Sequence, residues 1–472
     1  MENKHYEYLV IGAGVVGANI FSLLARQGKS VAMIDTALDV ATGASKANSG
    51  LVHAGFDAKP NTLKARLNVL GNKMYPSEAK RLGLPIKKTG AFVVGNDLNI
   101  IKDLIKRGNI NGVQGLEILK SEDLKSRLPM INSSIKYGLF APDAYIISPY
   151  MFTICLTEEG IINGGSVYLG YTTKKIVKQK DLFVVTDGKM QISTNVIINC
   201  AGAGYNNIAK LLNTEEYNIE YRRGEYYVLD TTERDLVPAT VFPLPTKESK
   251  GVLITPTIDG NILIGPTSTI GDIQTKTTAE DLNFVKNNAI NLIPNINFKK
   301  VIRIFSGVRS IVGEDFIIEK SRKVDGVVNI AGICSPGLSA APAIAEYVFD
   351  LIGEKKIKTH PKKIEPYKTL NKLSVNERNE LIKQNPAYGR IVCKCEGISE
   401  GEIIDALSRP LRVVSIDGVK RRTRTGMGRC QGGFCLSPTI ELIAKANKLQ
   451  LEDVVKENIG SNIIYGNVKE NV

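Results

Sequence analysis

The sequence predicts an α/β protein in which a nucleotide-binding domain of parallel strands carries an inserted antiparallel sheet and is followed by a small helical domain. Two observations carry this prediction. Close to the N-terminus, an apolar strand, a glycine-rich turn and a helical repeat of apolar residues follow one another as in a βαβ unit. Close to the C-terminus, four cysteines stand in two pairs, Cys393 with Cys395 and Cys430 with Cys435. Four soft ligands in a chain with a nucleotide site indicate a redox enzyme.

The length and composition fit a globular protein of two or three domains. The chain has 472 residues, of which 43% are hydrophobic and 23% charged, so well-filled cores are expected. No apolar run reaches the ~18 residues that a membrane-spanning helix needs, and no export signal precedes the first strand. We therefore expect a cytoplasmic protein without a transmembrane segment. The net charge is +13, but lysines and arginines are interleaved with acids along most of the chain, which argues against a nucleic-acid partner.

The first element is a strand at residues 6–11, followed by the turn GAGVVG and a helix at residues 18–27. Gly12 permits the tight turn, Gly14 lets backbone amides approach a pyrophosphate, and Gly17 allows the helix to pack closely. These glycines would hold a dinucleotide if a second strand follows the helix and completes the βαβ unit.

The second strand, residues 31–34, ends at Asp35, about 20 residues after the turn. A carboxylate at this point can accept a hydrogen bond from a ribose hydroxyl. With both strands and the acidic residue present, we predict a Rossmann-like dinucleotide site rather than a structural glycine turn. This fingerprint does not distinguish NAD from FAD.

Three further segments carry a family resemblance. TGASKANSGLVHAG at residues 42–55 resembles a flavin-side motif of the D-amino-acid-oxidase-like flavoproteins, in the branch that oxidises glycerol 3-phosphate and 2-hydroxyglutarate. NVIINCAGAG at residues 195–204 and VVNIAGICSPGLSAAPAIAEYVFDLI at residues 327–352 are similar to two more motifs of that family. The resemblance implies bound FAD and covers nearly the whole chain. It adds these expected cofactor-binding residues: Thr42, Ala44, Ser45, Asn48, Ser49, Gly50, Gly202, Gly332, Gly337, Leu338 and Ser339.

The last of these motifs also has a physical interpretation. Gly332 and Gly337 bracket a turn, and the small residues that follow open a helix whose first amides would face the cofactor. Reduced flavin is an anion, and a helix N-terminus together with a nearby cation would stabilise it by about 1 to 2 kcal/mol. An ordinary glycine-capped turn is the alternative.

Residues 90–96, 225–230, 251–257 and 261–267 have β-type composition and are expected to form one antiparallel sheet. The family resemblance implies that this sheet is inserted into the nucleotide-binding domain and covers the substrate. The expected FAD-dependent oxidoreductase region is 1–353, with FAD-binding segments at about 1–89, 146–215 and 325–353 and substrate-domain segments at about 90–145 and 216–324. A linker at 354–387 and a cysteine-rich domain at 388–460 follow.

His53 is the expected catalytic base. Oxidation of an alcohol requires removal of the hydroxyl proton as hydride leaves carbon, and imidazole titrates near neutral pH. In the resembled family, the histidine of the HAG sequence stands at this position of the motif. A histidine that only packs against the flavin is the alternative interpretation.

Arg309 and Lys250 are the expected anion-binding residues. The planar guanidinium of Arg309 suits a carboxylate or a phosphate, and the corresponding arginine of the resembled family contacts the substrate or the flavin surroundings. An ion pair with Glu314 is the alternative for Arg309. Lys250 could equally be a surface lysine at the end of a hairpin, and Arg223 is a further candidate for the pocket or for a salt bridge.

The cysteines near the C-terminus have the spacing Cys-x-Cys, 34 residues, Cys-x4-Cys. Thiolates and a glycine-rich loop with free amides suit an iron-sulfur centre, whereas structural zinc is the alternative. The spacing resembles the 2Fe-2S domain of the bacterioferritin-associated ferredoxins. We therefore expect Cys393, Cys395, Cys430 and Cys435 to bind a 2Fe-2S cluster.

A basic stretch, VKRRTRTGMGR, precedes the second cysteine pair. It could offset the negative charge of the cluster, steer an acidic redox partner, or simply be solvated.

Taken together, these features predict an FAD-dependent dehydrogenase that oxidises a small anionic alcohol. The first expected substrate is sn-glycerol 3-phosphate, converted to dihydroxyacetone phosphate, with electrons leaving through the cluster to a partner flavoprotein or another electron carrier. L-2-Hydroxyglutarate or another 2-hydroxyacid is the second. The same folds are also compatible with an amino-acid or imino-acid dehydrogenase and with a non-catalytic electron-relay subunit.

Overall fold

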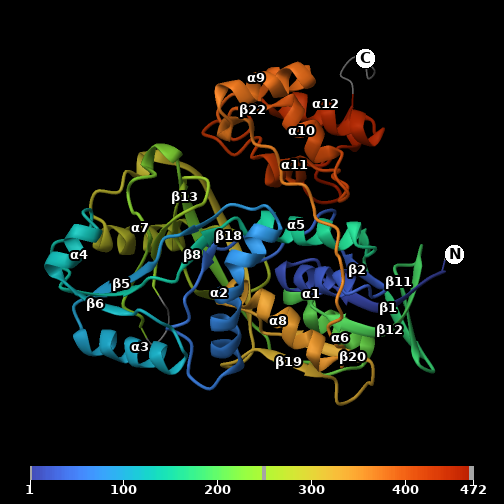
Figure 1. Cartoon of the computed structure of the whole chain (residues 1–472), viewed down its shortest axis with the longest axis horizontal. Helices are drawn as coiled ribbons and strands as arrows, with labels where there is room; N and C mark the ends of the chain where they lie inside the picture. The colour runs from blue at the N-terminus through green and yellow to red at the C-terminus, as the bar shows by residue number, and fades with distance from the viewer. Residues whose placement is uncertain (1–2, 247–250, 467–472) are drawn as a thin grey trace.

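The computed structural model describes residues 3–246 and 251–466, which form two large sheets and a helical C-terminal region (Figure 1). The first sheet has eight strands and a parallel centre. Its parallel strands are, in spatial order, β20 (Val327–Ala331), β12 (Gln191–Asn199), β1 (Asn3–Ile11), β2 (Val31–Asp35) and β9 (Ser166–Leu169). Antiparallel strands extend it: β10 (Lys175–Gln179), β11 (Leu182–Thr186) and β19 (Ile317–Lys320). The predicted Rossmann-like α/β fold is confirmed.

Apolar residues alternate between the two faces of this sheet, and both faces are covered. Val10 and Met33 pack in one cluster with helices α1 (Val15–Arg26) and α8 (Gly337–Leu351). Leu9 on the adjacent position of β1 packs on the opposite side with α6 (Tyr205–Leu212). Helix α5 (Pro149–Ile162) lies beside α1. Burial on both sides explains why the central strands are apolar throughout rather than alternating with polar residues.

The second sheet has nine strands and contains all four segments that the sequence predicts to form one sheet. These segments provide β5 (Ala91–Gly95), β13 (Glu220–Leu229), β15 (Leu253–Pro256) and β16 (Ile262–Gly265). The remaining strands are β6 (Glu117–Lys120), β7 (Tyr137–Ala141), β14 (Thr240–Pro243), β17 (Thr269–Gly271) and β18 (Val301–Ile311). Helices α3 (Leu98–Ile110), α4 (Ser121–Arg127) and α7 (Ala279–Leu292) accompany it.

One pair in this sheet departs from the antiparallel pattern. Strands β5 and β14 are parallel. No hairpin connects β5 to β14. After β7 the chain leaves this sheet, contributes β9 to β12 to the first sheet, and re-enters the second sheet with β13. A long crossover of this kind permits parallel pairing, which a tight turn does not.

A three-stranded sheet and one long helix join these two parts. The strands are β3 (Leu51–Val52), β8 (Tyr145–Ile147) and β4 (Ile86–Lys88), and the helix is α2 (Leu63–Arg81). Helix α2 crosses α8 closely at Gly71, where a Cβ atom would stand 2.1 Å from the carbonyl oxygen of Ser339. The absence of a side chain at Gly71 therefore allows the two helices to meet beside the HAG segment.

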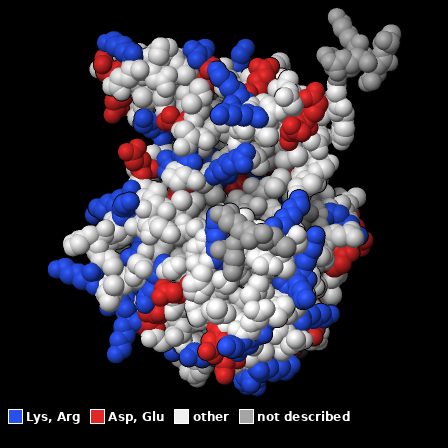
Figure 2. Space-filling view, turned by 90° about the vertical axis from the view of Figure 1, so that its right-hand side faces the viewer, with Lys and Arg blue, Asp and Glu red and all other residues white. Residues whose placement is uncertain are grey.

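The C-terminal region forms a smaller lobe above the rest, joined to it across a narrower waist (Figure 2). Its helices are α10 (Glu400–Leu407), α11 (Ile416–Thr423) and α12 (Leu436–Asn447), and its short strands are β21 (Ile391–Cys393) and β22 (Ile398–Ser399). Ile403, Val419 and Ile443, one from each helix, are fully buried in its core. Such a small core leaves room for a metal centre to contribute to folding.

The stretch 354–387 lies against the rest of the protein. The hydroxyl of Tyr367 donates to Glu158 of α5 at 2.8 Å, and the guanidinium of Arg409 lies 3.8 Å from the centre of the Tyr367 ring. This stretch also contains helix α9 (Val375–Gln384), which begins with a capping box between Ser374 and Glu377. Among the described residues, no helix combines the length and the apolar character required to cross a bilayer.

Candidate active site and metal centre

The turn after β1 has the geometry of a dinucleotide cradle. Gly12 has φ of +112°, and a Cβ atom there would stand 2.4 Å from the carbonyl oxygen of Cys200, which follows β12. A Cβ atom on Gly17 would stand 2.0 Å from the carbonyl oxygen of Gly12. Gly14, the N-cap of α1, supplies no capping side chain and has only the Ser45 hydroxyl nearby. The Ser45 hydroxyl accepts from the first N–H of the helix, that of Val15, and among the described residues the next N–H groups have no side-chain cap, which fits the pyrophosphate of FAD.

Asp35 lies at the end of β2, as expected, and is already bound to the glycine turn. Its Oδ2 accepts from the backbone N–H of Ala13 at 2.7 Å, and its Oδ1 accepts from that of Ala37 at 2.9 Å. Burial raises the pKa of Asp35, and the backbone hydrogen bonds oppose this rise. Because each carboxylate oxygen can accept more than one hydrogen bond, Asp35 can still receive a ribose hydroxyl.

The segment from Thr42 to Gly50 forms a loop beside this turn. Ser45 Oγ accepts from the backbone N–H of Val15 at 2.9 Å, which ties the loop to the start of α1. Asn48 donates to the carbonyl of Ala44 at 3.0 Å and accepts from the backbone N–H of Gly50 at 2.9 Å. Thr42 and Ser49 are partly exposed on the same loop, and Gly202 lies in the turn after β12 with φ of +56°. These residues therefore gather at one end of the parallel sheet.

The start of α8 holds the HAG segment. The helix begins at Gly337 without a side-chain cap. The hydroxyl of Ser339 accepts from the backbone N–H of His53 at 2.7 Å, and the carbonyl of Leu338 accepts from the hydroxyl of Tyr75. Gly332 has φ of +67° in the turn that precedes the helix. The closing motif and the HAG segment, nearly 300 residues apart, are thus one structural unit.

His53 is buried and its ring has a defined hydrogen-bond partner. Its Nδ1 accepts from the backbone N–H of Gly55 at 3.0 Å, and its ring lies 4.5 Å from that of Phe56 and 6.1 Å from that of Phe242. With Nδ1 as acceptor, the neutral ring carries its hydrogen on Nε2. Nε2 can accept a proton only after the ring hydrogen moves to Nδ1, which requires the Gly55 contact to be given up.

Two buried asparagines of α2 lie beside this segment, and sequence reasoning missed both. The side-chain amide of Asn72 donates to the carbonyl of His53 at 3.1 Å and to that of Asp143 at 2.7 Å. Asn68, one helical turn earlier, is fully buried, and neither of its polar atoms has a partner among the described residues. The i, i+4 spacing of two asparagines in LKARLNVLGN is the signal that could have found them.

Arg309 lies on the face of the second sheet that meets the loop of residues 42–50. A Cβ atom on Gly307, two positions before it, would stand 2.2 Å from the carbonyl oxygen of Ala47. Arg309 donates to the carbonyl of Thr267, while its Nε is buried without a partner among the described residues, and burial lowers the pKa of the guanidinium. A buried cation of this kind calls for an anion. Glu314 is not that anion, because it pairs with Lys59 at 2.7 Å.

Arg222, rather than Arg223, shares this face. In the antiparallel pairing of β13 with β18, Arg222 stands directly opposite Arg309. Side chains alternate along a strand, so Arg223 points the opposite way. There it pairs with Glu225 and with Asp281 of α7, at 2.9 Å each. Arg223 therefore forms a salt bridge and not a pocket wall. Lys250 lies outside the described residues.

The four C-terminal cysteines form two neighbouring pairs. Cys395 and Cys430 have their sulfurs 3.5 Å apart, and Cys393 and Cys435 are hydrogen-bonded to each other. The Cys435 thiol and the backbone N–H groups of Gly426 and Glu396 lower the pKa of Cys393 to about 6. Amides aimed at sulfurs stabilise thiolates, as a 2Fe-2S cluster requires. The first pair is at or near the surface and the second is buried.

Most of the basic stretch is turned inward, although Arg429 at its end is exposed. Arg421 and Arg422 are 5% exposed, and Arg424 forms ion pairs at 2.8 Å with Asp259, in the β15–β16 turn, and with Glu396. These arginines therefore meet acids of this same chain. The expectation that the stretch steers an acidic redox partner is wrong for these three residues, because their charges are already paired inside the protein.

Comparisons with known proteins agree with this geometry. The family model described as FAD dependent oxidoreductase matches residues 7–351, and that of the BFD-like [2Fe-2S] binding domain matches residues 391–445. The chain is 39% identical over 483 residues to a glycerol 3-phosphate dehydrogenase of Caloramator mitchellensis, covering 99% of this chain and 100% of the relative. The 2Fe-2S expectation is thereby favoured over zinc, and FAD over NAD.

Two further similarities are more distant. An L-2-hydroxyglutarate dehydrogenase of Arabidopsis thaliana is 26% identical over 407 residues, covering 73% of this chain and 83% of the relative. The solved structure of an L-alpha-glycerophosphate oxidase from Mycoplasma pneumoniae with FAD bound is 27% identical, with a TM-score of 0.73, and covers 78% of this chain and 99% of that one. Both fall within the branch expected from the sequence motifs.

Proposed function

Because the chain belongs to the FAD-dependent oxidoreductase family and carries a BFD-like [2Fe-2S] domain, we propose that it oxidises sn-glycerol 3-phosphate to dihydroxyacetone phosphate. The observation that supports this most is full-length similarity to a glycerol 3-phosphate dehydrogenase that spans both the oxidoreductase and the cysteine-rich region. The reaction removes one hydride from carbon and one proton from the hydroxyl. When bound, FAD accepts the hydride, and the 2Fe-2S cluster carries the electrons singly to a separate electron carrier.

The residues of the chain divide the work. Arg309, with Arg222 opposite it, binds the phosphate dianion, which supplies the counter-charge that Arg309 lacks among the described residues. Lys250 is a further candidate for this contact. His53 takes the hydroxyl proton at Nε2 once its contact with the Gly55 N–H is released. The start of α8 and the Ser339 hydroxyl hold the His53 backbone in place while the ring adjusts.

The flavin-binding residues are proposed from their geometry. They are Gly12, Gly14, Gly17, Asp35, Thr42, Ala44, Ser45, Asn48, Ser49, Gly50, Gly202, Gly332, Gly337, Leu338 and Ser339. The glycine turn and the start of α1 would hold the pyrophosphate, and the start of α8 would stabilise negative charge on the reduced ring.

The test is anaerobic reduction of the purified protein by separate substrates. Glycerol 3-phosphate is expected to bleach the flavin absorbance and then to reduce the cluster. L-2-Hydroxyglutarate is the second candidate, since guanidinium groups bind carboxylates as well as phosphates and one relative is named for this substrate. Reduction by 2-hydroxyglutarate alone would transfer the proposal to that substrate. Reduction by an amino acid alone would refute both.

A further inference from the structure

The waist between the C-terminal region and the rest of the protein is lined by opposite charges. Acids of the oxidoreductase part face arginines of the C-terminal part. The pairs are Asp39 with Arg421 and Arg422, Glu158 with Arg409, Asp259 with Arg424, and Asp230 with Arg429. One pair has the reverse polarity, Lys46 with Glu457. Charges arranged in this way specify one docking orientation and penalise the rest.

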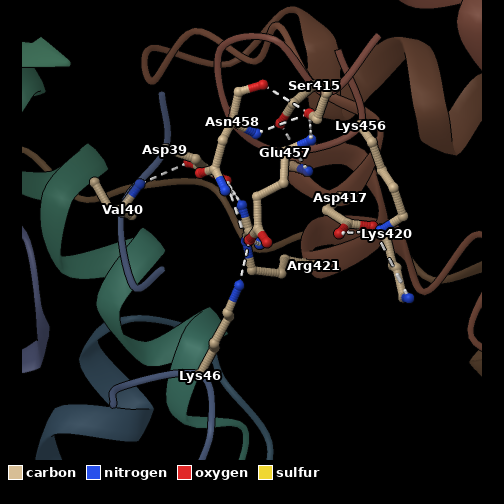
Figure 3. A network of polar contacts seen from close by, with 12 residues as sticks. Asp39, Val40, Lys46, Ser415, Asp417, Lys420, Arg421, Lys456, Glu457 and Asn458 are labelled. Atoms are coloured by element: carbon tan, nitrogen blue, oxygen red, sulfur yellow. Dashed lines mark hydrogen bonds and ion pairs between the residues drawn. The ribbon is translucent and has the colours of Figure 1, made fainter. Parts of the chain in front are cut away.

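Three of these acids, Asp39, Asp230 and Asp259, lie in loops of the oxidoreductase part. Asp39 has the least exposed side chain of the three. It is 2% exposed and accepts hydrogen bonds from both guanidinium groups of Arg421 and Arg422, at 2.8 to 3.2 Å. Figure 3 shows Asp39 and Lys46 reaching across to Arg421 and Glu457 of the C-terminal region. Burial would raise the pKa of Asp39, but Arg422 and Arg421 outweigh it and lower the pKa to about 2. The carboxylate is therefore charged at any physiological pH.

Asp39 belongs to the same loop as the proposed flavin-binding residues. The backbone N–H of Ala41, two residues later, donates to the carbonyl of Ala13 in the glycine turn at 3.0 Å. Lys46, between Ser45 and Asn48, pairs with Glu457. One short loop thus contacts the dinucleotide cradle on one side and the C-terminal region on the opposite side.

In the C-terminal region, α11 leads directly to the cluster loop. Arg424 at its C-terminus pairs with Asp259 of the second sheet, and the cysteine loop starts immediately afterwards. Met427 in that loop has its sulfur 3.8 Å from the hydroxyl of Tyr150 on α5. The next residue, Gly428, is so close to Cys395 that a Cβ atom would stand 2.4 Å from the Cys395 Cβ. The position of α11 therefore decides where the cluster sits.

A cavity also lies at this boundary. This cavity, of about 610 Å³, lies between the C-terminal part and the oxidoreductase part, and Arg421, Arg422, Arg424, Tyr150 and Asp259 line it. The two surfaces do not touch across this cavity, so apolar packing at the cavity cannot hold the C-terminal region in its orientation. The buried ion pairs at its rim carry the orientation.

We propose that Asp39 is a positioning residue that clamps α11 against the flavin-binding loop and so holds the cluster at a fixed place relative to the flavin. The proposal rests on the electron exit assigned under the proposed function. In this arrangement the C-terminal region is a fixed part of the electron route and not a lobe that swings on the 354–387 stretch. Asp39 and Asp259, which pair with the basic stretch, belong to the oxidoreductase part of this same chain.

The experiment compares two clamp variants with a control on the same helix. Asp39→Asn removes the negative charge on the loop side of the ion pair. Arg421→Gln removes one of its positive charges on the C-terminal side and leaves the sequence of the loop unchanged. Asp417→Asn is the control, because Asp417 is similarly buried but pairs with Lys456 and Lys420 inside the C-terminal region. All three are made in the full chain with both cofactors bound.

Two readouts are used, and neither depends on the substrate. Hydrogen exchange of peptides covering 36–50 and 416–423 is expected to be at least about tenfold faster in both clamp variants, because a buried charge has lost its partner. After flash photoreduction of the flavin, reduction of the cluster is expected to slow by a similar factor, with the rate of flavin reduction unchanged. In Asp417→Asn, exchange of the 36–50 peptide and the rate of cluster reduction stay within about twofold of wild type, because among the described residues Asp417 pairs with lysines of the C-terminal region and not with the loop.

Wild-type exchange and wild-type cluster reduction in Asp39→Asn and Arg421→Gln would overturn the proposal. Equal changes in Asp417→Asn would also overturn it, since the effect would then reflect general loosening of the C-terminal region. A failure of glycerol 3-phosphate to reduce the flavin of the wild type would refute the proposed substrate while leaving both of these readouts intact.

Discussion

Arg222 and Arg309 stand directly opposite each other on β13 and β18, on the face of the second sheet that meets the loop of residues 42–50. Two like charges in this register repel each other. Arg222 pairs with Glu220, whereas Arg309, whose Nε is buried, has no carboxylate partner among the described residues. A bound anion would remove this repulsion, which supports the proposed binding of a negatively charged substrate here.

Replacing Arg309 should weaken substrate use while leaving the flavin in place. Arg309→Gln is expected to lower kcat/KM for glycerol 3-phosphate by about 30- to 1,000-fold, equivalent to about 2 to 4 kcal/mol, because the anion loses a desolvated charged partner. Steady-state kinetics and the flavin content of the purified variant measure this. Arg223→Gln is the matched control on the neighbouring strand, and an equal loss there would contradict the assignment of the two faces.

His53→Gln tests the proton acceptor. Flavin reduction by substrate is expected to slow by about 10²- to 10⁴-fold, because glutamine cannot take the hydroxyl proton. Stopped-flow absorbance of the flavin measures this rate directly for wild type and variant. A variant that reduces at the wild-type rate would leave His53 only a packing role.

Gly17→Ala tests the dinucleotide cradle. The added methyl group would meet the carbonyl oxygen of Gly12 at 2.0 Å, so the turn must open and FAD binding is expected to weaken strongly. Flavin content after purification and calorimetric titration with FAD measure the effect. Gly43→Ala is the control, because a Cβ atom at Gly43 meets nothing within 4 Å.

Removal of the cluster should loosen the C-terminal region alone. The small core around α10 to α12 would gain folding energy from the four proposed thiolate ligands, so Cys393→Ser or chelation of iron is expected to expose residues 391–445 to protease. The oxidoreductase part should stay resistant and retain FAD. Cys155→Ser, at a buried thiol outside the cluster, is the control. Full protease resistance of the iron-free protein would refute this prediction.

The Asp39 clamp should give way in acid. The pKa of Asp39 is about 2 in the folded protein and about 3.9 in an unfolded chain, so its ion pairs contribute about 2 kcal/mol that is complete above about pH 4 and lost as the pH falls toward 2. Thermal unfolding followed by circular dichroism is expected to show a difference between wild type and Asp39→Asn at about pH 5 that narrows at about pH 3. A constant difference would assign the stability to another group.

Local patterns determined much of this protein. The glycine turn and Asp35 were readable because the βαβ unit is contiguous and its roles depend on backbone geometry. The four cysteines were readable from spacing, and the single sheet from four β-type segments. The motifs at 42–55, 195–204 and 327–352 identified the family, and the comparisons agree with them.

The tertiary structure decided what depends on distant pairing. Strand register placed Arg222, and not Arg223, beside Arg309, since one residue of shift turns a side chain to the opposite face. The Ser339 to His53 contact joins segments nearly 300 residues apart. The sequence showed a basic stretch with three interpretations, but only folding brought Asp39 to Arg421 and Arg422 and turned those charges inward. Burial of a charge and its pairing across domains leave no local pattern in the sequence, because the partner is distant in the chain and becomes a neighbour only in the folded protein.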